Sequence, residues 1–211
     1  MKDPGFAKFV VLVNGSVPLA MLGWDAYNRQ LGADPENRAI HVTGMTALIF
    51  LMLTLAVTPV RKITGWNWLS HFRRMLGLFA FTYASVHFLI YFALEHGFNI
   101  TSVVNDALAH NFIFFGMTAL LLMVPLAATS TNGIIKWMGA AKWKRLHRLV
   151  YLSSIAAVLH YCLFGKLGGW SAFRDFSHWP QEVFVGILVV LLGWRVFASA
   201  RKPTPSPAAG A

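Results

Sequence analysis

Two histidines lie inside long apolar segments, where an imidazole side chain is unexpected. His87 falls within residues 75–94 and His160 within residues 149–165, and neither segment contains a charged residue. A polar side chain in such surroundings is costly, so it marks a functional site. Two imidazoles that share one ligand in an apolar slot are typical of haem iron with two axial histidines. The pair therefore predicts a haem-binding site between two helices.

The flanking charges place the two histidines at a similar depth. His87 follows Arg74 by 13 residues, and His160 follows Arg148 by 12. If both helices run in the same direction, the two rings lie level and can face each other. Alternatives remain open at this point, because an intramembrane histidine also forms hydrogen bonds to a neighbouring helix, relays protons, or binds the substrate of a transporter or haem carrier.

The neighbours of each histidine on its own helix fit a site for a flat ligand. Tyr83 and Tyr91 lie four residues before and after His87, on one stripe of a helix. Small residues precede His160 by about one or two turns and leave space on its face; they are Ser153, Ala156 and Ala157. Small residues also let helices pack closely in a membrane, so they do not require a ligand.

The composition indicates an all-α integral membrane protein. Of the 211 residues, 56% are hydrophobic and only 12% are charged, whereas a soluble domain is about 25% charged. A membrane-spanning helix needs roughly 20 mainly apolar residues. Six segments meet or approach this length, and they predict a six-helix transmembrane bundle: 9–24, 42–60, 75–94, 112–128, 149–165 and 183–200. We expect the first to remain a helix and not to be cleaved as a signal peptide.

The basic residues predict the orientation of the bundle. Fourteen of the 18 Lys and Arg fall before the first segment, in the second-to-third and fourth-to-fifth connections, or at the C-terminal end. The opposite side has four of them and seven of the eight acids. The positive-inside rule therefore places both termini in the cytoplasm. The net charge of +10 comes from basic residues spread over these connections, where anionic lipid headgroups can attract them. It therefore does not predict a nucleic-acid partner.

The remaining histidines and the single cysteine give weaker signals. His147 lies 13 residues before His160, at the expected membrane edge, and is a candidate ligand for a second haem or a residue that contacts lipid phosphate. His41 is a candidate contact for a quinone or a porphyrin propionate. The histidines of the outer connections, His96, His110 and His178, are expected to be solvated. Cys162 stands alone, which excludes a C-x-x-C-H attachment, so the haem is predicted to be b-type.

Several short motifs together resemble a known family. They are H-V-T-G at 41–44, R-R-M-L-G-L at 73–78 followed by His87, T-S-T-N at 129–132, and L-H-R-L-V-Y at 146–151 followed by H-Y at 160–161. In their order and spacing they are similar to the haem-binding membrane subunit of the periplasmic protein-methionine-sulfoxide reductase system, in the ferric-reductase-like transmembrane superfamily. The resemblance covers roughly residues 10–200.

The resemblance implies a function and a set of cofactors. It implies a bacterial inner-membrane protein that binds haem b, and it makes His87, His147 and His160 the candidate haem ligands. FMN is also attributed to the family. Electrons would pass from the quinone pool to a periplasmic molybdopterin-dependent reductase that repairs methionine sulfoxide in envelope proteins. Membrane quinol or a flavin reductase would be the donor. The alternatives are a stand-alone ferric or quinone reductase and a non-redox haem carrier or transporter.

The expected domain organisation is simple. Residues 1–202 form one ferric-reductase-like haem-binding transmembrane domain, and the Pro-rich end 203–211 is a disordered tail. No dinucleotide-binding fingerprint is present, so this chain has no nicotinamide domain of its own. No pair of residues is expected to perform group-transfer chemistry, which would belong to the partner.

Overall fold

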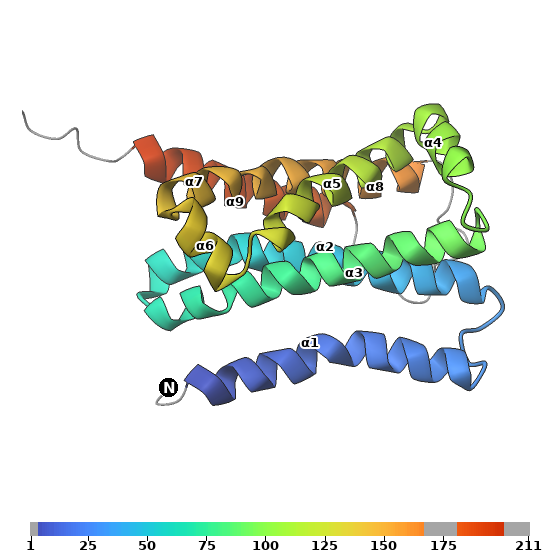
Figure 1. Ribbon diagram of the computed structural model, residues 1–211, viewed down its shortest axis with the longest axis horizontal. Helices are drawn as coiled ribbons and strands as arrows, with labels where there is room; N and C mark the ends of the chain where they lie inside the picture. Colours follow the sequence, from blue (N-terminus) through green and yellow to red (C-terminus); the bar gives the residue numbers. More distant parts are fainter. Residues whose placement is uncertain (1–3, 167–180, 201–211) are drawn as a thin grey trace, which may run out of the picture.

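The computed structural model describes residues 4–166 and 181–200, and within these ranges the regular structure is entirely helical. The elements in chain order are α1 (Pro4–Tyr27), α2 (Pro35–Thr64), the 3₁₀ helix η1 (Asn67–His71), α3 (Arg73–Leu94), α4 (Ile100–Ala109), α5 (Asn111–Ala128), α6 (Asn132–Met138), α7 (Ala140–Leu146), α8 (Leu149–Lys166) and α9 (Gln181–Ala200). Figure 1 shows the long helices lying side by side. The tail 203–211 and His178 fall outside the described residues.

The prediction of six membrane-length helices is confirmed. Within the described residues, six helices are long and apolar enough to cross a membrane, and each contains one of the predicted segments. Many large apolar side chains on the outside of the bundle are exposed, among them Phe9, Leu53, Leu121 and Val190. Exposed apolar surface of this extent fits lipid as the surrounding solvent. The chain is therefore a multi-pass membrane protein.

Local sequence signals fix where several helices begin and end. Asp34 accepts a hydrogen bond from the Asn37 backbone N–H at 3.1 Å, and Pro35 follows as the first helical residue of α2. Gly65 ends the same helix with a positive φ of 74°, which glycine adopts without strain. Asn99 caps α4 through Ser102, and Thr131 caps α6. Residues 129–131 therefore link the end of α5 to the start of α6.

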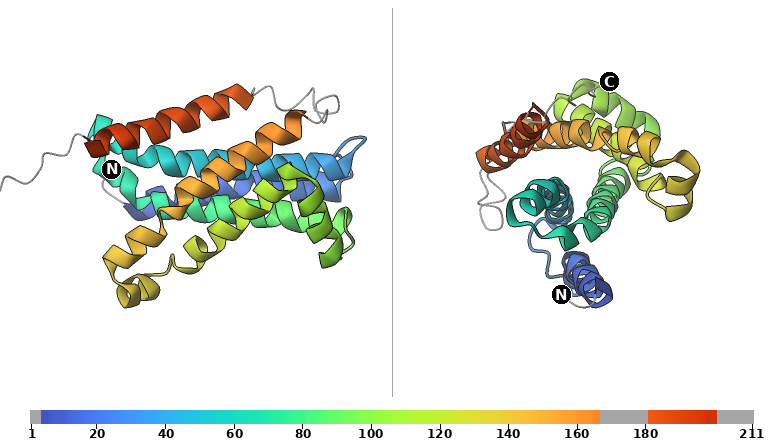
Figure 2. Two further views of the ribbon diagram at one scale, coloured as in Figure 1. Left: turned by 90° about the horizontal axis from the view of Figure 1, so that it is seen from above. Right: turned by 90° about the vertical axis from the view of Figure 1, so that its left-hand side faces the viewer.

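Two helix pairs form the centre of the bundle. The most extensive contacts join α2 to α3 and α5 to α8, and α3 also touches α5. Within each pair the two helices are antiparallel. Helices α3 and α8 run in the same direction, as the depth argument required (Figure 2). A buried apolar cluster combines α2, α3, α5, α8 and α9, with Leu55 and Ala80 almost fully buried.

Helix α1 lies at one side of this bundle (Figure 2), where the Phe79 ring of α3 packs against Gly15 and Tyr83 bonds to its backbone. The Tyr83 hydroxyl donates to the Gly15 carbonyl at 2.8 Å and accepts from the Leu19 backbone N–H at 3.1 Å. An uninterrupted α-helix would join that N–H and that carbonyl directly. The hydroxyl is thus inserted into the hydrogen-bond ladder of α1, next to Pro18, which has no N–H to donate.

The charged segments separate to the two ends of the bundle. One end carries the basic residues of the α2–α3 connection and of α6 and α7; we call residues 61–74 and 132–148 the basic end. The other, with the α1–α2 connection and α4, contains five acids; we call residues 25–36 and 95–111 the acidic end. In Figure 1 the basic end is on the left and the acidic end on the right. The short helices α4, α6 and α7 lie in connections for which the sequence predicted no helix.

Candidate functional site

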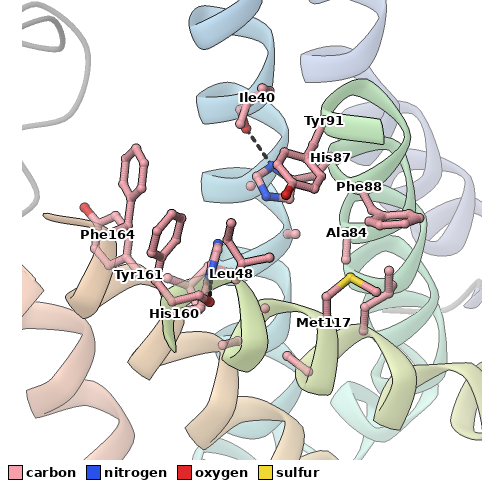
Figure 3. Close-up of a pocket in the computed structure, with 18 of the residues that line it drawn as sticks. Ile40, Leu48, Ala84, His87, Phe88, Tyr91, Met117, His160, Tyr161 and Phe164 are labelled. Atoms are coloured by element: carbon pink, nitrogen blue, oxygen red, sulfur yellow. Dashed lines mark hydrogen bonds between the residues drawn. The ribbon is translucent and has the colours of Figure 1, made fainter. Parts of the chain in front are cut away.

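His87 on α3 and His160 on α8 face each other near the middle of the bundle. Their ring centroids are 6.0 Å apart, and the ring planes meet at 78°. The sequence separates them by 73 residues, so only the packing of the α2–α3 pair against the α5–α8 pair brings them together. Figure 3 shows both rings at the wall of one cavity. The predicted level arrangement of the two histidines is confirmed.

Each ring is held by a backbone carbonyl of the helix that pairs with its own. His87 Nδ1 lies 2.8 Å from the Ile40 carbonyl oxygen on α2, and His160 Nδ1 lies 2.7 Å from the Phe112 carbonyl oxygen on α5. A carbonyl only accepts, so Nδ1 carries the proton and donates in both cases. This leaves Nε2 of each ring with its lone pair, the form in which an imidazole binds a metal.

Two glycines make room for the rings. A Cβ atom at Gly44 would lie 2.9 Å from His87 Cε1 and Nδ1, and one at Gly116 would lie 2.8 Å from His160 Nδ1. Gly44 follows Ile40 by four residues and Gly116 follows Phe112 by four, so carbonyl and glycine are one turn apart on the same helix face. The α2–α3 pair and the α5–α8 pair therefore use the same device to seat a histidine.

The cavity between the four central helices has a volume of about 420 Å³. One part of its wall is apolar and includes Leu48, Leu51, Ala84 and Met123. The part toward the acidic end is polar and is formed by Asn37, His41, Tyr91, Glu95, Asp106 and His110. A flat apolar ligand with one polar edge fits such a lining. His41 and Tyr91 thus reach the cavity, as the sequence suggested.

Other residues expected near the ligand have different roles. Tyr83 faces α1, where its hydroxyl bonds to the backbone. Tyr91 follows it by eight residues, which turn an α-helix about 80° beyond two whole turns, so the two side chains point to different neighbours. Ser153 is fully buried and donates to the Ala119 carbonyl at 3.0 Å, which packs α8 on α5. Ala156 is buried and lies outside the cavity lining, whereas Ala157 lines it. The small residues therefore serve mainly helix packing, the alternative that the sequence left open.

His147 is separate from the cavity. It caps α7 at the basic end, its ring lies 3.9 Å from that of Trp143, and its Nδ1 is 3.2 Å from the Trp143 carbonyl oxygen. The chain makes a turn between α7 and α8 at this point, so His147 and His160 do not share one regular helix. The structure thus brings His87 and His160 together and leaves His147 apart.

The acidic end holds a cluster of polar side chains against the cavity. We call Tyr91, Glu95, His96, Asp106 and His110 the acidic-end cluster. The Tyr91 hydroxyl donates to Asp106 Oδ2 at 2.5 Å, and His110 Nδ1 donates to Asp106 Oδ1 at 2.7 Å. His96 Nε2 lies 3.3 Å from Asp106 Oδ2, and its side chain is only 10% exposed. The expectation that His96 is solvated is wrong, because its side chain is largely buried beside Asp106. His110 is exposed as expected, and it also bonds to Asp106.

The two carboxyl groups of the cluster differ in their affinity for protons. Burial tends to raise the pKa of Asp106, but the hydrogen bonds from Tyr91 and His110 outweigh it and hold that pKa below its usual value. Burial raises the pKa of Glu95, and the nearby charges of Glu36 and Asp106 raise it further.

The described residues contain no group of three His, Cys, Asp or Glu arranged to hold a metal ion directly.

Comparison with known proteins gives the family. The sequence pattern of the family described as "Ferric reductase like transmembrane component" matches residues 43–158, more than half of the chain. "Protein-methionine-sulfoxide reductase heme-binding subunit MsrQ" of Herminiimonas arsenicoxydans is 38% identical over 92% of this chain and 86% of that protein. The subunit of the same name from Xanthomonas euvesicatoria is 41% identical, over 96% and 94% of the two chains. That from Brucella anthropi is 40% identical, over 92% and 84%.

These matches establish the class first and then the family. The match over residues 43–158 and the six long apolar helices define a ferric-reductase-like membrane protein. The chain belongs to the family of heme-binding subunits of protein-methionine-sulfoxide reductase. The resemblance stated from the motifs is therefore confirmed.

Proposed function

We propose that this chain is a membrane electron conduit with a haem b held by His87 and His160. The observation that carries the proposal is the geometry of the two rings. Metal–imidazole bonds are about 2 Å long, so two imidazoles on one metal ion have ring centroids about 6 Å apart. The rings of this chain have that separation, and each keeps Nε2 available. Haem would supply one-electron chemistry, cycling between Fe(II) and Fe(III).

The chain's own residues would hold and insulate this group. The Ile40 and Phe112 carbonyls orient the rings and increase the electron density at Nε2, which favours the ferric state. The apolar wall of α2, α3 and α5 excludes water, and the loss of water opposes the extra charge of the ferric state. The balance of these two influences sets the midpoint potential. In this proposal the site itself performs no chemistry on a substrate, so the electrons would pass to a separate acceptor.

The orientation proposed for the conduit is both termini in the cytoplasm of a bacterial inner membrane. The support is the separation of charge, because basic residues gather at the end that holds α6 and α7. In this orientation the histidine pair lies nearer the acidic, periplasmic end. Residues 1–202 would form the transmembrane domain.

The proposed partners follow from the family. Membrane quinol, or a flavin reductase on the basic end, would donate electrons, and a periplasmic molybdopterin-dependent methionine sulfoxide reductase would accept them. The acceptor would dock on 25–40, 96–111 and 165–181, of which the structure describes the first two and the edges of the third. FMN and a second haem at His147 are further expectations of the family. His147 lies away from the cavity, so a haem there would need its own site.

A direct test uses membranes that contain the full chain. A reduced-minus-oxidised spectrum should show a b-type signal, and pyridine haemochrome and flavin assays should count the cofactors. The haem is then reduced, and oxidised periplasmic reductase is added with a methionine sulfoxide substrate. Rapid reoxidation that depends on the substrate supports the conduit. Haem that stays reduced beside an active reductase contradicts it and favours a stand-alone reductase, and the absence of any redox-active haem favours a transporter.

A further inference from the structure

The acidic-end cluster lies directly next to the proposed electron site. Tyr91 is one helical turn beyond His87 on α3, and the two residues line the same cavity. The Tyr91 hydroxyl then connects to Asp106 on α4, and Asp106 connects to His110, whose side chain is 52% exposed. A chain of hydrogen-bonded side chains thus leads from Tyr91, at the cavity wall, to solvent at the acidic end.

The cluster combines an ionised carboxylate with groups that take up protons. Asp106 is held ionised, since its pKa lies below the usual value despite partial burial. Its two histidine neighbours lie within 2.7 and 3.3 Å of its carboxylate oxygens. Glu95 is the carboxyl group whose pKa is raised, by partial burial and by the neighbouring carboxylates, so it binds a proton more readily than an acid without such neighbours.

Charged groups on each neighbouring element also act on the cluster. Tyr91 lies on α3, and Glu95 directly follows that helix. His96 lies in the connection between α3 and α4, and His110 lies between α4 and α5. Helix α2 and its cap add three more titratable groups, namely Asp34, Glu36 and His41, of which the first two interact electrostatically with Glu95. The surroundings are therefore net acidic, which favours proton uptake when further negative charge arrives.

We propose that the acidic-end cluster takes up a proton from solution when an electron enters the cavity between His87 and His160, and releases it when the electron leaves. The inference rests on the proposed function, which supplies the electron and its one-electron carrier. The added electron makes the low-dielectric cavity more negative, and a proton on the cluster compensates that charge at short range. The proton comes from and returns to the solution at the acidic end, so charge and atoms balance.

The proposal makes the midpoint potential of the haem dependent on pH. Because the reduced state binds the proton more tightly, the potential falls as pH rises. The upper limit is one proton per electron, which corresponds to 59 mV for each tenfold change in proton concentration. A haem with no linked proton group has a potential that does not change with pH.

The experiment is a potentiometric titration of the purified full-length chain at several values between about pH 5.5 and 8.5. The variants are Asp106→Asn and Glu95→Gln, and the matched control is Asp25→Asn, a carboxylate at the acidic end that does not line the cavity. We expect a clear slope in the unmodified chain and in Asp25→Asn. We expect a much smaller slope in Asp106→Asn and a reduced one in Glu95→Gln. Haem content and the reduced spectrum are recorded for each variant.

The outcomes separate this inference from the proposed function. A b-type haem whose potential is independent of pH in the unmodified chain overturns the inference and leaves the conduit intact. A full slope in Asp106→Asn overturns it as well. If Asp106→Asn loses its haem, His110→Gln, at an exposed position of the same cluster, must show the smaller slope instead. A chain that binds no haem at all defeats the proposed function, and the inference with it.

Discussion

Replacing Gly44 with alanine tests whether the seat of His87 determines haem binding. The new Cβ would lie 2.9 Å from His87 Cε1 and Nδ1, whereas ordinary contact begins at 3.4 Å. The ring must therefore move by about 0.5 Å, away from the Ile40 carbonyl that now accepts its hydrogen bond at 2.8 Å. Alanine raises the helix propensity of α2 by about 1 kcal/mol, so a loss of function cannot come from a weaker helix.

The size of the effect follows from the hydrogen bond that is disturbed. Loss of the partner that orients a metal-binding histidine weakens binding roughly 10- to 100-fold. We expect Gly44→Ala to bind haem more weakly by a factor in this range and to show a shifted b-type spectrum. The assay is a haem titration of the apoprotein in detergent, followed by absorbance.

A matched substitution controls for a general effect of alanine in a spanning helix. A Cβ at Gly186, on α9, would meet nothing within 4 Å, so Gly186→Ala should bind haem like the unmodified chain. Gly116→Ala should reproduce the effect of Gly44→Ala through His160, because the two seats have the same geometry. If Gly44→Ala binds haem with unchanged affinity and an unchanged spectrum, the reasoning from the glycine seat is wrong.

Three further expectations concern the ligands, the first helix and the orientation. Replacing His87 or His160 with alanine should remove most of the b-type absorbance while the protein stays in the membrane; His147→Ala should have a smaller or separate effect, and full haem content in His160→Ala would refute the pairing. Tyr83→Phe removes the hydroxyl that joins α1 to α3, so stability should fall by about 1 kcal/mol, seen as a lower apparent Tm, while haem content stays constant. An alkaline phosphatase fusion after Ala211 should be inactive, and periplasmic activity there would contradict the proposed orientation.

The linear pattern of the sequence was sufficient for the helices, the segregation of charge and the histidine pair. Each of these depends on distance along the chain. A span needs only its own apolar residues, and the depth of His87 or His160 follows from the rise per residue after a basic flank. For the same reason the family could be recognised from short motifs in a fixed order.

Only the tertiary structure showed how the two rings are held. The His87–Ile40 and His160–Phe112 hydrogen bonds join residues 47 and 48 positions apart, on different helices. Periodicity tells which residues share a face of one helix, but not which helix lies opposite that face. Gly44 was visible within H-V-T-G, yet its role appears only when the ring that occupies its space is known.

The acidic-end cluster depended on the tertiary structure for the same physical reason. The sequence placed His96 and His110 in a connection, where a solvated side chain is the ordinary expectation. The short helix α4 turns Asp106 toward Tyr91, and that contact converts separate polar residues into one hydrogen-bonded group next to the cavity. Tyr83 and Tyr91 have the same residue type and spacing from His87, but they face different partners, α1 and α4, because the packing of α3 exposes each to a different neighbour.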